Sequence, residues 1–285
     1  MRCRCGDDVP HTIDLDDSQS VVALFKEAIG RFPDHVALEC FGQSMTYRQL
    51  DAASDAVATA LQKQCGVKKG DRVAIMLPNI FAYPVTMLGV LKTGAVQVNV
   101  NPLYTPRELE HQLNDSGAET IIIYSASTPA LAPIRGNTSV SQVITVDPGD
   151  GAGLAIPGAD MGDHRRLADL IGQYAGTQPE PVTLSGEDTL FLQYTGGTTG
   201  PSKGATLTHR NLIANSLQFR SFLPAANEPG GEVLVLALPM YHIFGLMIFV
   251  AYSAIGAKSI LIPNPRDMDA YLNAIKDSGF TVIGG

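Results

Sequence analysis

Apolar and polar residues alternate along this chain with two periods, one typical of helices and the other of buried strands. The apolar residues of 20–32 fall on one helical face, so this segment is predicted to be an amphipathic helix. Thr46 and Gln49 have the spacing of a capping box, which predicts a second helix after Thr46. Thr105, followed by a proline and then Glu108, predicts a third helix start.

Short apolar runs between these helices predict strands. The runs lie at 72–77, 120–124, 142–146, 190–194, 233–238 and 259–262. Because apolar residues are continuous in most of them, the strands are expected to be buried on both faces. The order of helices and strands therefore predicts an α/β fold of mostly parallel sheets covered by helices.

Residues 147–188 interrupt this alternation, and both ends of the segment are rich in proline and glycine. A short helix is possible only at 167–171. We therefore predict a loop-rich junction here, with a first α/β sub-domain over 1–180. A second sub-domain is predicted to begin within 181–285.

One long uncharged segment, from Val233 to Ala257, could in principle span a bilayer. Pro239 divides it after a run typical of a strand. The remaining stretch, Ile243 to Gly256, has the length of a buried core helix rather than a membrane span. The sequence therefore predicts a strand, a turn and a buried helix.

Composition and charge narrow the function classes. The 285 residues are 45% apolar and 17% charged, a balance that excludes wholesale disorder. A net charge of −8 argues against nucleic acid as a partner. The four cysteines form no C-x-x-C pair, and the first thirty residues contain no apolar signal-peptide core, so a cytoplasmic protein is expected.

The segment 194–205 carries the most distinctive chemistry. It combines four glycines, four Ser or Thr hydroxyls and one lysine, after the predicted strand 190–194 and before a helix start at Thr208. Glycine lets backbone N–H groups approach an anion, and lysine adds a positive charge, so a polyphosphate site is predicted. The alternative is an ordinary Gly/Thr-rich surface loop. The order Ser202-Lys203-Gly204 differs from that of a Walker P-loop.

Five segments together resemble a known family, the adenylate-forming enzymes. They lie at 45–50, 92–95, 99–106, 192–203 and 238–245, in the family's order. Within the family, the sequences of these segments are most similar to those of bacterial long-chain fatty-acid–CoA ligases. The resemblance implies an ATP-dependent reaction in which a fatty acid forms an acyl-adenylate and then an acyl-CoA. ATP, Mg²⁺ and coenzyme A are the implied cofactors, and a fatty acid is the implied substrate.

The resemblance also implies roles for individual residues. Lys203 would neutralise the β- and γ-phosphates, Thr198 would donate a hydroxyl as a second catalytic residue, and His242 would lie near the substrate carboxylate. The implied nucleotide site comprises Tyr194, Thr195, Gly196, Gly197, Thr198, Thr199, Gly200, Pro201, Ser202, Lys203, Gly204 and Ala205. No protein ligand for a metal is predicted.

For His242 the alternative is a structural histidine, hydrogen-bonded in the core. The apolar run that follows it could line a tunnel for the acyl chain, with Gly245 leaving room at its mouth and Phe244 and Leu246 beside it. An ordinary core helix is the alternative there, and only the resemblance favours the tunnel. Peripheral contact with the inner membrane face through the lipid substrate stays open, and the residues specify no oligomeric state.

The later blocks of the family are missing from these residues, including the mobile C-terminal domain on which coenzyme A binding depends. The chain is therefore expected to be inactive alone, as the first portion of a ligase. Two other interpretations remain: an adenylate-forming enzyme for another carboxylic acid, and a non-catalytic nucleotide- or acyl-binding remnant.

Overall fold

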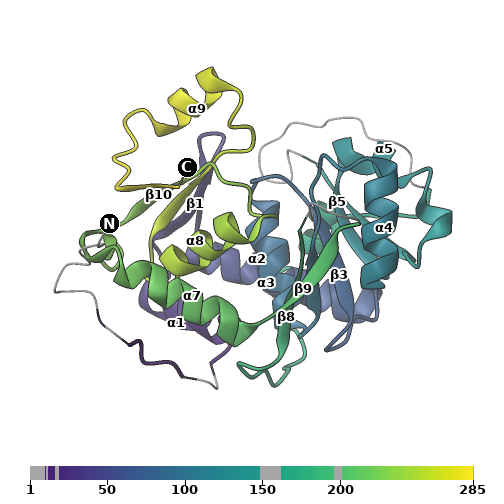
Figure 1. The fold of residues 1–285 in the computed structure, drawn as a ribbon, viewed down its shortest axis with the longest axis horizontal. Coiled ribbons are helices and arrows are strands. Elements are labelled where there is room, and N and C mark those ends of the chain that lie inside the picture. The colour runs from purple at the N-terminus through teal and green to yellow at the C-terminus, as the bar shows by residue number, and fades with distance from the viewer. Residues whose placement is uncertain (1–9, 11, 17–18, 148–161, 196–200, 285) are drawn as a thin grey trace.

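A computed structural model describes residues 10, 12–16, 19–147, 162–195 and 201–284 of the chain. Within these residues, helices and strands alternate and build two sheets with helices on their faces (Figure 1). The prediction of an α/β fold with mostly parallel strands is confirmed.

The larger sheet contains seven strands among the described residues, in the order β7-β6-β5-β3-β4-β8-β9. All neighbours are parallel except β8 and β9, which form an antiparallel hairpin at one edge. The bounds are β3 Arg72–Met76, β4 Val96–Asn99, β5 Thr120–Tyr124, β6 Gln142–Val146, β7 Arg165–Arg166, β8 Thr189–Thr195 and β9 Lys203–Thr208.

The smaller sheet contains five described strands, in the order β12-β10-β11-β1-β2. Only β1 and β2 are antiparallel neighbours. The bounds are β1 Val36–Cys40, β2 Gln43–Thr46, β10 Val233–Leu236, β11 Lys258–Leu261 and β12 Val282–Gly284. The predicted strands are thus present, although β10 ends two residues before the predicted 238.

Nine α-helices and three short 3₁₀ helices occur in the described part of the chain. The α-helices are α1 Val21–Arg31, α2 Tyr47–Gln64, α3 Ala82–Lys92, α4 Pro106–Ser116, α5 Thr128–Leu131, α6 Leu167–Gln173, α7 His209–Ser221, α8 Ile243–Ser253 and α9 Met268–Ile275. The 3₁₀ helices are η1 Ser125–Ser127, η2 Arg135–Asn137 and η3 Pro224–Ala226.

Local sequence signals account for the helix starts. Thr46 and Thr105 each accept a hydrogen bond from the third backbone N–H of their helix, and Gln49 and Glu108 complete the two capping boxes. Gly117 ends α4 with a left-handed φ of 62°, which glycine adopts without strain. The predicted capping box at Thr46 and the predicted helix start at Thr105 are confirmed.

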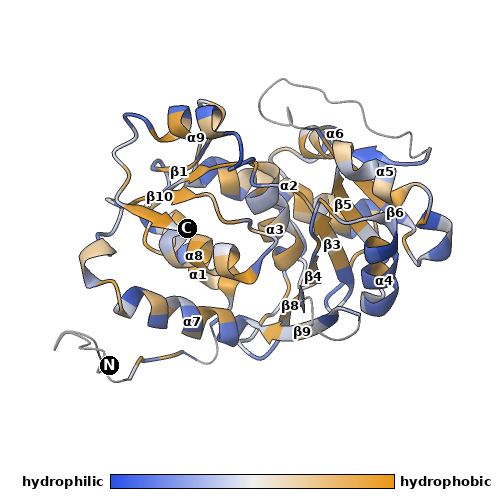
Figure 2. Ribbon diagram, turned by 45° about the horizontal axis from the view of Figure 1, so that its top comes forward, coloured by the Kyte–Doolittle hydropathy of each residue, from blue (hydrophilic) through white to orange (hydrophobic). Residues whose placement is uncertain are grey.

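The molecule is layered, and its main core lies between the two sheets. Alternate residues of one strand face different layers: Ile75 of β3 joins the main core with α2, α3 and α8, whereas Met76 faces α4 on the outer side. On the smaller sheet, Leu234 faces the main core and Val235 faces α9. Figure 2 shows the apolar strands inside and mixed helices such as α4 and α7 outside. Among the described residues, no helix is both long and apolar enough to cross a membrane.

One sequence-based expectation differs from the structure. The segment after the glycine-rich loop was expected to lead directly into a helix, but 203–208 forms β9 first, so the loop closes a hairpin. An edge strand needs no continuous apolar run, which is why β9 lacks one. Strands β8 and β9 complete the larger sheet, and β1 and β2 complete the smaller one. The division into two sub-domains near residue 180 stays a prediction.

Candidate active site

The predicted phosphate loop is the connection of the β8–β9 hairpin. Thr195 pairs with Lys203 across the two arms, and both are exposed at the loop end of the hairpin. Five predicted site residues lie outside the described residues: Gly196, Gly197, Thr198, Thr199 and Gly200. Of the others, Ser202 is half-buried, while Pro201 and Ala205 are exposed. The described arms therefore present one lysine and one threonine toward the loop.

Tyr194 and Gly204 face each other one pair deeper in the hairpin. The ring of Tyr194 lies so close to Gly204 that an added Cβ would stand 2.9 Å from its Cζ atom. A larger residue at 204 would displace the ring, so glycine is required here by close approach. Tyr194 is only 7% exposed, and its ring covers the glycine of the neighbouring strand.

The loop between β10 and α8 carries His242. His242 caps α8: its Nδ1 accepts a hydrogen bond of 3.4 Å from the Phe244 backbone N–H. The side chain is exposed, so the alternative of a buried core histidine does not describe it. Its Nε2 atom has no hydrogen-bond partner among the residues the structure describes. The ring is thus held at the start of a helix, where the helix dipole favours an anion.

Asn79, which follows β3, holds this loop through hydrogen bonds from its side-chain amide to the loop backbone. Its Nδ2 donates to the carbonyl oxygens of Leu236 and Leu238 at 3.1 and 2.9 Å, and its Oδ1 accepts from the Met240 N–H at 2.8 Å. Asn79 is buried, so these bonds are shielded from water. The Asn79 side chain therefore makes three of the hydrogen bonds that hold the loop before His242.

A second buried amide connects this loop to the phosphate hairpin. Gln193 of β8 donates from Nε2 to the Tyr241 carbonyl oxygen at 3.2 Å, and its Oε1 accepts from Asn99 Nδ2 at 2.8 Å. Tyr83 Oη lies 2.8 Å from the Met240 carbonyl oxygen and 3.0 Å from Asn99 Oδ1. Burial raises the pKa of Tyr83, so its phenol stays protonated. The network joins three of the sequence blocks at one place.

The sequence did not single out Asn79 or Tyr83, and it noted Asn99 only as part of a block. A buried Asn or Gln close to a strand end is one signal that could have pointed to them, because such side chains need partners from other segments. Which segments supply those partners depends on the sheet order. That order is not readable from local patterns.

The predicted tunnel residues lie on both sides of α8. Phe244 is 43% exposed, and it lines a cavity of about 720 Å³ with Phe219 and Met247. Leu246 is fully buried in the main core. Gly245 leaves no open space: a Cβ there would stand 2.5 Å from the Pro239 carbonyl oxygen. The expectation that Gly245 leaves room is therefore wrong, and the glycine allows α8 to pack against the preceding turn.

A cavity of about 630 Å³ opens at the carboxyl ends of the parallel strands of both sheets. Its walls follow β3, β5, β10 and β11, and include Asn79, Tyr124, Pro239, Tyr241 and Ile262. Burial raises the pKa of Tyr241, which lies beside His242. In open α/β sheets, ligands bind outside the carboxyl ends of the strands, so this cavity is the best-placed ligand site in the described structure.

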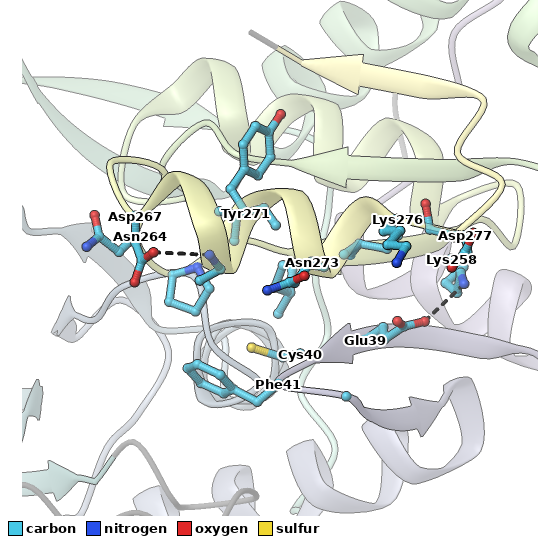
Figure 3. Close-up of a pocket in the computed structure, with 18 residues that line it drawn as sticks. Glu39, Cys40, Phe41, Lys258, Asn264, Asp267, Tyr271, Asn273, Lys276 and Asp277 are labelled. Carbon is cyan, nitrogen blue, oxygen red and sulfur yellow. Dashed lines mark hydrogen bonds and ion pairs between the residues drawn. The ribbon is translucent and has the colours of Figure 1, made fainter.

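A further cavity of about 570 Å³ lies between α9 and the strands β1 and β11 (Figure 3). Polar groups line its rim, among them the ion pair between Glu39 and Lys258 at 3.0 Å. None of the predicted site residues is among those that line it. We therefore place the candidate active site at the hairpin and the loop before α8, not here.

The described residues contain no group of three or more His, Cys, Asp or Glu side chains that could hold a metal ion. The positive charge that the described arms of the hairpin offer an anionic ligand is that of Lys203.

Comparison with known proteins agrees with this geometry. The sequence pattern of the AMP-binding enzyme family matches residues 25–285. The long-chain-fatty-acid–CoA ligase of Escherichia coli O6:H1 is 42% identical over 98% of this chain and 52% of its own length. The enzyme of the same name from Bacillus subtilis is 31% identical over 90% of the chain and 48% of its own length. The chain thus spans about half the length of these relatives.

Solved structures give the same picture. A long-chain-fatty-acid–CoA ligase from Archaeoglobus fulgidus superposes with a TM-score of 0.80 at 24% identity, over 95% of this chain and 52% of the other. The N-terminal domain of FACL13 from Mycobacterium tuberculosis superposes with a TM-score of 0.78 at 26% identity, over 94% and 63%. From the matching family pattern and these likenesses, the chain belongs to the family of AMP-binding enzymes.

Proposed function

We propose that this chain forms part of a long-chain fatty-acid–CoA ligase and supplies its polyphosphate-binding side. In the proposed reaction a fatty-acid carboxylate oxygen bonds to the α-phosphorus of ATP, and pyrophosphate leaves with the bonding electrons. The thiolate of coenzyme A then attacks the acyl carbon, and AMP leaves. The observation that carries the proposal is the 42% identity, over 98% of the chain, to a ligase of this name.

Lys203 is proposed to act on the leaving pyrophosphate. Its ammonium group is exposed at the first residue of β9, where strand pairing with Thr195 fixes the backbone. Negative charge grows on pyrophosphate as it departs, and a cation already in place stabilises that charge without reorganisation. Thr198, the Thr195, Thr199 and Ser202 hydroxyls and the backbone N–H groups of the glycines are proposed as further donors.

His242 is proposed to orient the carboxylate. Because Nδ1 caps α8, the Nε2 atom is the one that can reach a substrate oxygen. The first turn of α8 offers a positive helix-dipole end at the same position, which favours a carboxylate and an adenylate phosphate. A position beside the cavity wall formed by Tyr241 supports this role.

The acyl chain is proposed to follow the apolar surface beside Phe244 and Met247, whereas Leu246 is buried in the main core and does not line this cavity. The exposed ring of Phe244 and the ring of Phe219 have centroids 6.3 Å apart, in an edge-to-face contact at one wall of the 720 Å³ cavity. An alkyl chain buried here would gain about 0.8 kcal/mol per methylene. Gly245 has no proposed contact with the chain, because its space is occupied by the Pro239 carbonyl oxygen.

Three further parts of the proposal concern small molecules and location. Mg²⁺ is proposed to be held by the phosphates of ATP, where it supplies charge neutralisation. Coenzyme A is proposed to bind largely through residues beyond this chain, so that the chain alone does not turn over. A cytoplasmic location, with contact to the inner membrane face through the lipid substrate, stays a prediction.

The proposal is tested by comparing two non-hydrolysable acyl-adenylate analogues, palmitoyl-sulfamoyl-adenosine and benzoyl-sulfamoyl-adenosine, in calorimetric titrations of the 285-residue chain. The long-chain analogue is expected to bind at least about tenfold more tightly, because the benzoyl group buries far fewer methylenes. Tighter binding of the benzoyl compound would favour activation of another acid. Binding of palmitate without either analogue would favour an acyl-binding remnant.

A further inference from the structure

We propose that α4 positions both arms of the phosphate hairpin through His111 and Asp115, and thereby sets the place of Lys203. These two residues are positioning residues, since they act through the hairpin and not on a substrate. The inference deepens the proposed function and rests on it. It concerns only described residues of α4, β8 and β9.

The first contact holds the β8 arm. Tyr194 donates its phenol hydrogen to the Asp115 carboxylate, with an Oη–Oδ2 distance of 2.5 Å. Burial together with the hydrogen bond and charge of Asp115 raises the pKa of Tyr194, so the phenol remains a donor. The same ring covers Gly204 on the opposite arm. A single aromatic side chain therefore connects α4 to both strands.

The second contact holds the β9 arm directly. His111 Nε2 lies 2.9 Å from the carbonyl oxygen of Ser202. A carbonyl oxygen only accepts, so the imidazole must carry its hydrogen on Nε2. Ser202 is the residue immediately before Lys203. This carbonyl belongs to the peptide group that also contains the Lys203 backbone nitrogen. A hydrogen bond that holds the carbonyl therefore also holds the backbone of Lys203.

His111 and Asp115 are four residues apart, so they lie on the same face of α4, one turn from each other. Their targets are the two strands of one hairpin. One rigid face thus holds two arms, which sets the separation of the strands where the loop leaves them. A single contact to one arm would leave the other arm able to shift.

The helix itself is firmly fixed. Leu109 and Leu113 are fully buried in the outer core, and Gln112 donates to the Asn99 carbonyl oxygen at 2.8 Å. The capping box of Thr105 and Glu108 begins the helix, and Gly117 in a left-handed conformation ends it. The Asn99 side chain also hydrogen-bonds to Gln193 of β8, so α4 and the hairpin are both bound to the same residue of β4. A fixed helix can transmit position, whereas a loosely packed one cannot.

In contrast, the Lys203 side chain is exposed and has no hydrogen bond or ion pair within the described part of the chain. Because no other described group holds this side chain, its reach toward a ligand is determined by the position of the Lys203 backbone. Other groups set that position. This is why we assign the positioning to α4. A purely structural role would change the stability of the hairpin without changing the affinity for polyphosphate.

The test uses the 285-residue chain, with MgATP and inorganic pyrophosphate as probes in calorimetric titrations. His111→Leu and Tyr194→Phe each remove one contact, and each is expected to weaken pyrophosphate binding about threefold to tenfold, the range for one hydrogen bond. His111→Gln keeps an N–H donor and Asp115→Asn keeps an acceptor, so both are expected to stay within about twofold of wild type. Asn114→Ala, an exposed site on the same helix, is the matched control.

Hydrogen exchange of the backbone amides in 203–208, measured without ligand, reports on the hairpin separately. His111→Leu and Tyr194→Phe are expected to raise exchange there and leave α4 unchanged. Unchanged pyrophosphate affinity in both variants, with wild-type binding intact, would overturn the positioning role. No binding of either probe by the wild-type chain would contradict the proposed function, and with it the inference built on it. The two failures are thus distinguishable.

Discussion

The two loops that carry the predicted site residues are held in different ways. The loop before α8 is fixed from the core by Asn79, whose buried side-chain amide makes three hydrogen bonds. The phosphate hairpin stands at the edge of the larger sheet and is held by half-exposed contacts from α4. Changes at the first loop should therefore act on folding, whereas changes at the hairpin should act on ligand affinity.

The largest expected effect comes from breaking the buried loop. Asn79→Ala removes three hydrogen bonds and takes away the side-chain partner of the Met240 N–H and of the Leu238 carbonyl oxygen, while the Leu236 carbonyl oxygen still accepts from the Ile262 N–H. We expect a loss of about 4 kcal/mol in the free energy of unfolding. Urea denaturation measures it, and Asn273→Ala, at an exposed site on α9, is the matched control with an expected change below about 0.5 kcal/mol. Equal effects of the two changes would contradict the assigned role of Asn79.

His209, at the base of the hairpin where β9 meets α7, is buried, and its protonation is expected to make the free energy of unfolding depend on pH. His209 is 2% exposed, and its Nδ1 accepts from the Val21 N–H at 3.1 Å. Burial, with a smaller contribution from Lys69 and against the charge of Asp188, lowers the pKa of His209 to about 4. The neutral ring is the form that can accept this bond.

The folded and unfolded pKa values of His209 decide whether stability rises or falls with pH. The folded pKa is below the unfolded value of about 6.5, so the contribution of His209 is complete above pH 6.5 and is lost as pH falls toward 4. The loss is expected to reach about 3 kcal/mol. His209→Gln should flatten the difference between urea midpoints at pH 7 and pH 4.5. The same pH dependence in wild type and variant would rule out this assignment.

A glycine comparison tests the close packing of α8. Gly245→Ala places a Cβ 2.5 Å from the Pro239 carbonyl oxygen, and backbone cannot rotate away as a side chain can. We expect a loss of about 2 kcal/mol. Gly30→Ala in α1 meets no atom within 4 Å and should gain up to about 1 kcal/mol. Thermal unfolding of both variants decides the point, and a neutral Gly245→Ala would restore the idea of open space there.

Local signals in the sequence predicted what depends on neighbours in the chain. Thr105 and Glu108 form their capping box because the spacing alone fixes that contact, and Leu109 and Leu113 share a buried face because helical spacing requires it. The α/β class follows from the same patterns. Residues 194–205 were predicted as a nucleotide site from composition and resemblance, and that role stays a prediction.

The contacts that depend on sheet order could not be predicted in this way. Gln193 meets Asn99 because β8 lies beside β4 in the larger sheet, and it meets Tyr241 because the loop after β10 lies near the end of β8; both depend on the tertiary arrangement. Strand β9 was missed because an edge strand with a glycine lacks a strong pattern. The role of Gly245 depends on a turn that places the Pro239 carbonyl oxygen beside it, and no spacing rule describes that turn.

Binding of polyphosphate by the hairpin is proposed to depend on Lys203. The direct measurement is the dissociation constant of MgATP for the 285-residue chain and for Lys203→Ala, with Lys63→Ala in the last turn of α2 as the matched control. We expect Lys203→Ala to weaken binding about tenfold or more, with an unchanged free energy of unfolding, and Lys63→Ala to bind as wild type does. Equal affinity of wild type and Lys203→Ala would contradict the account.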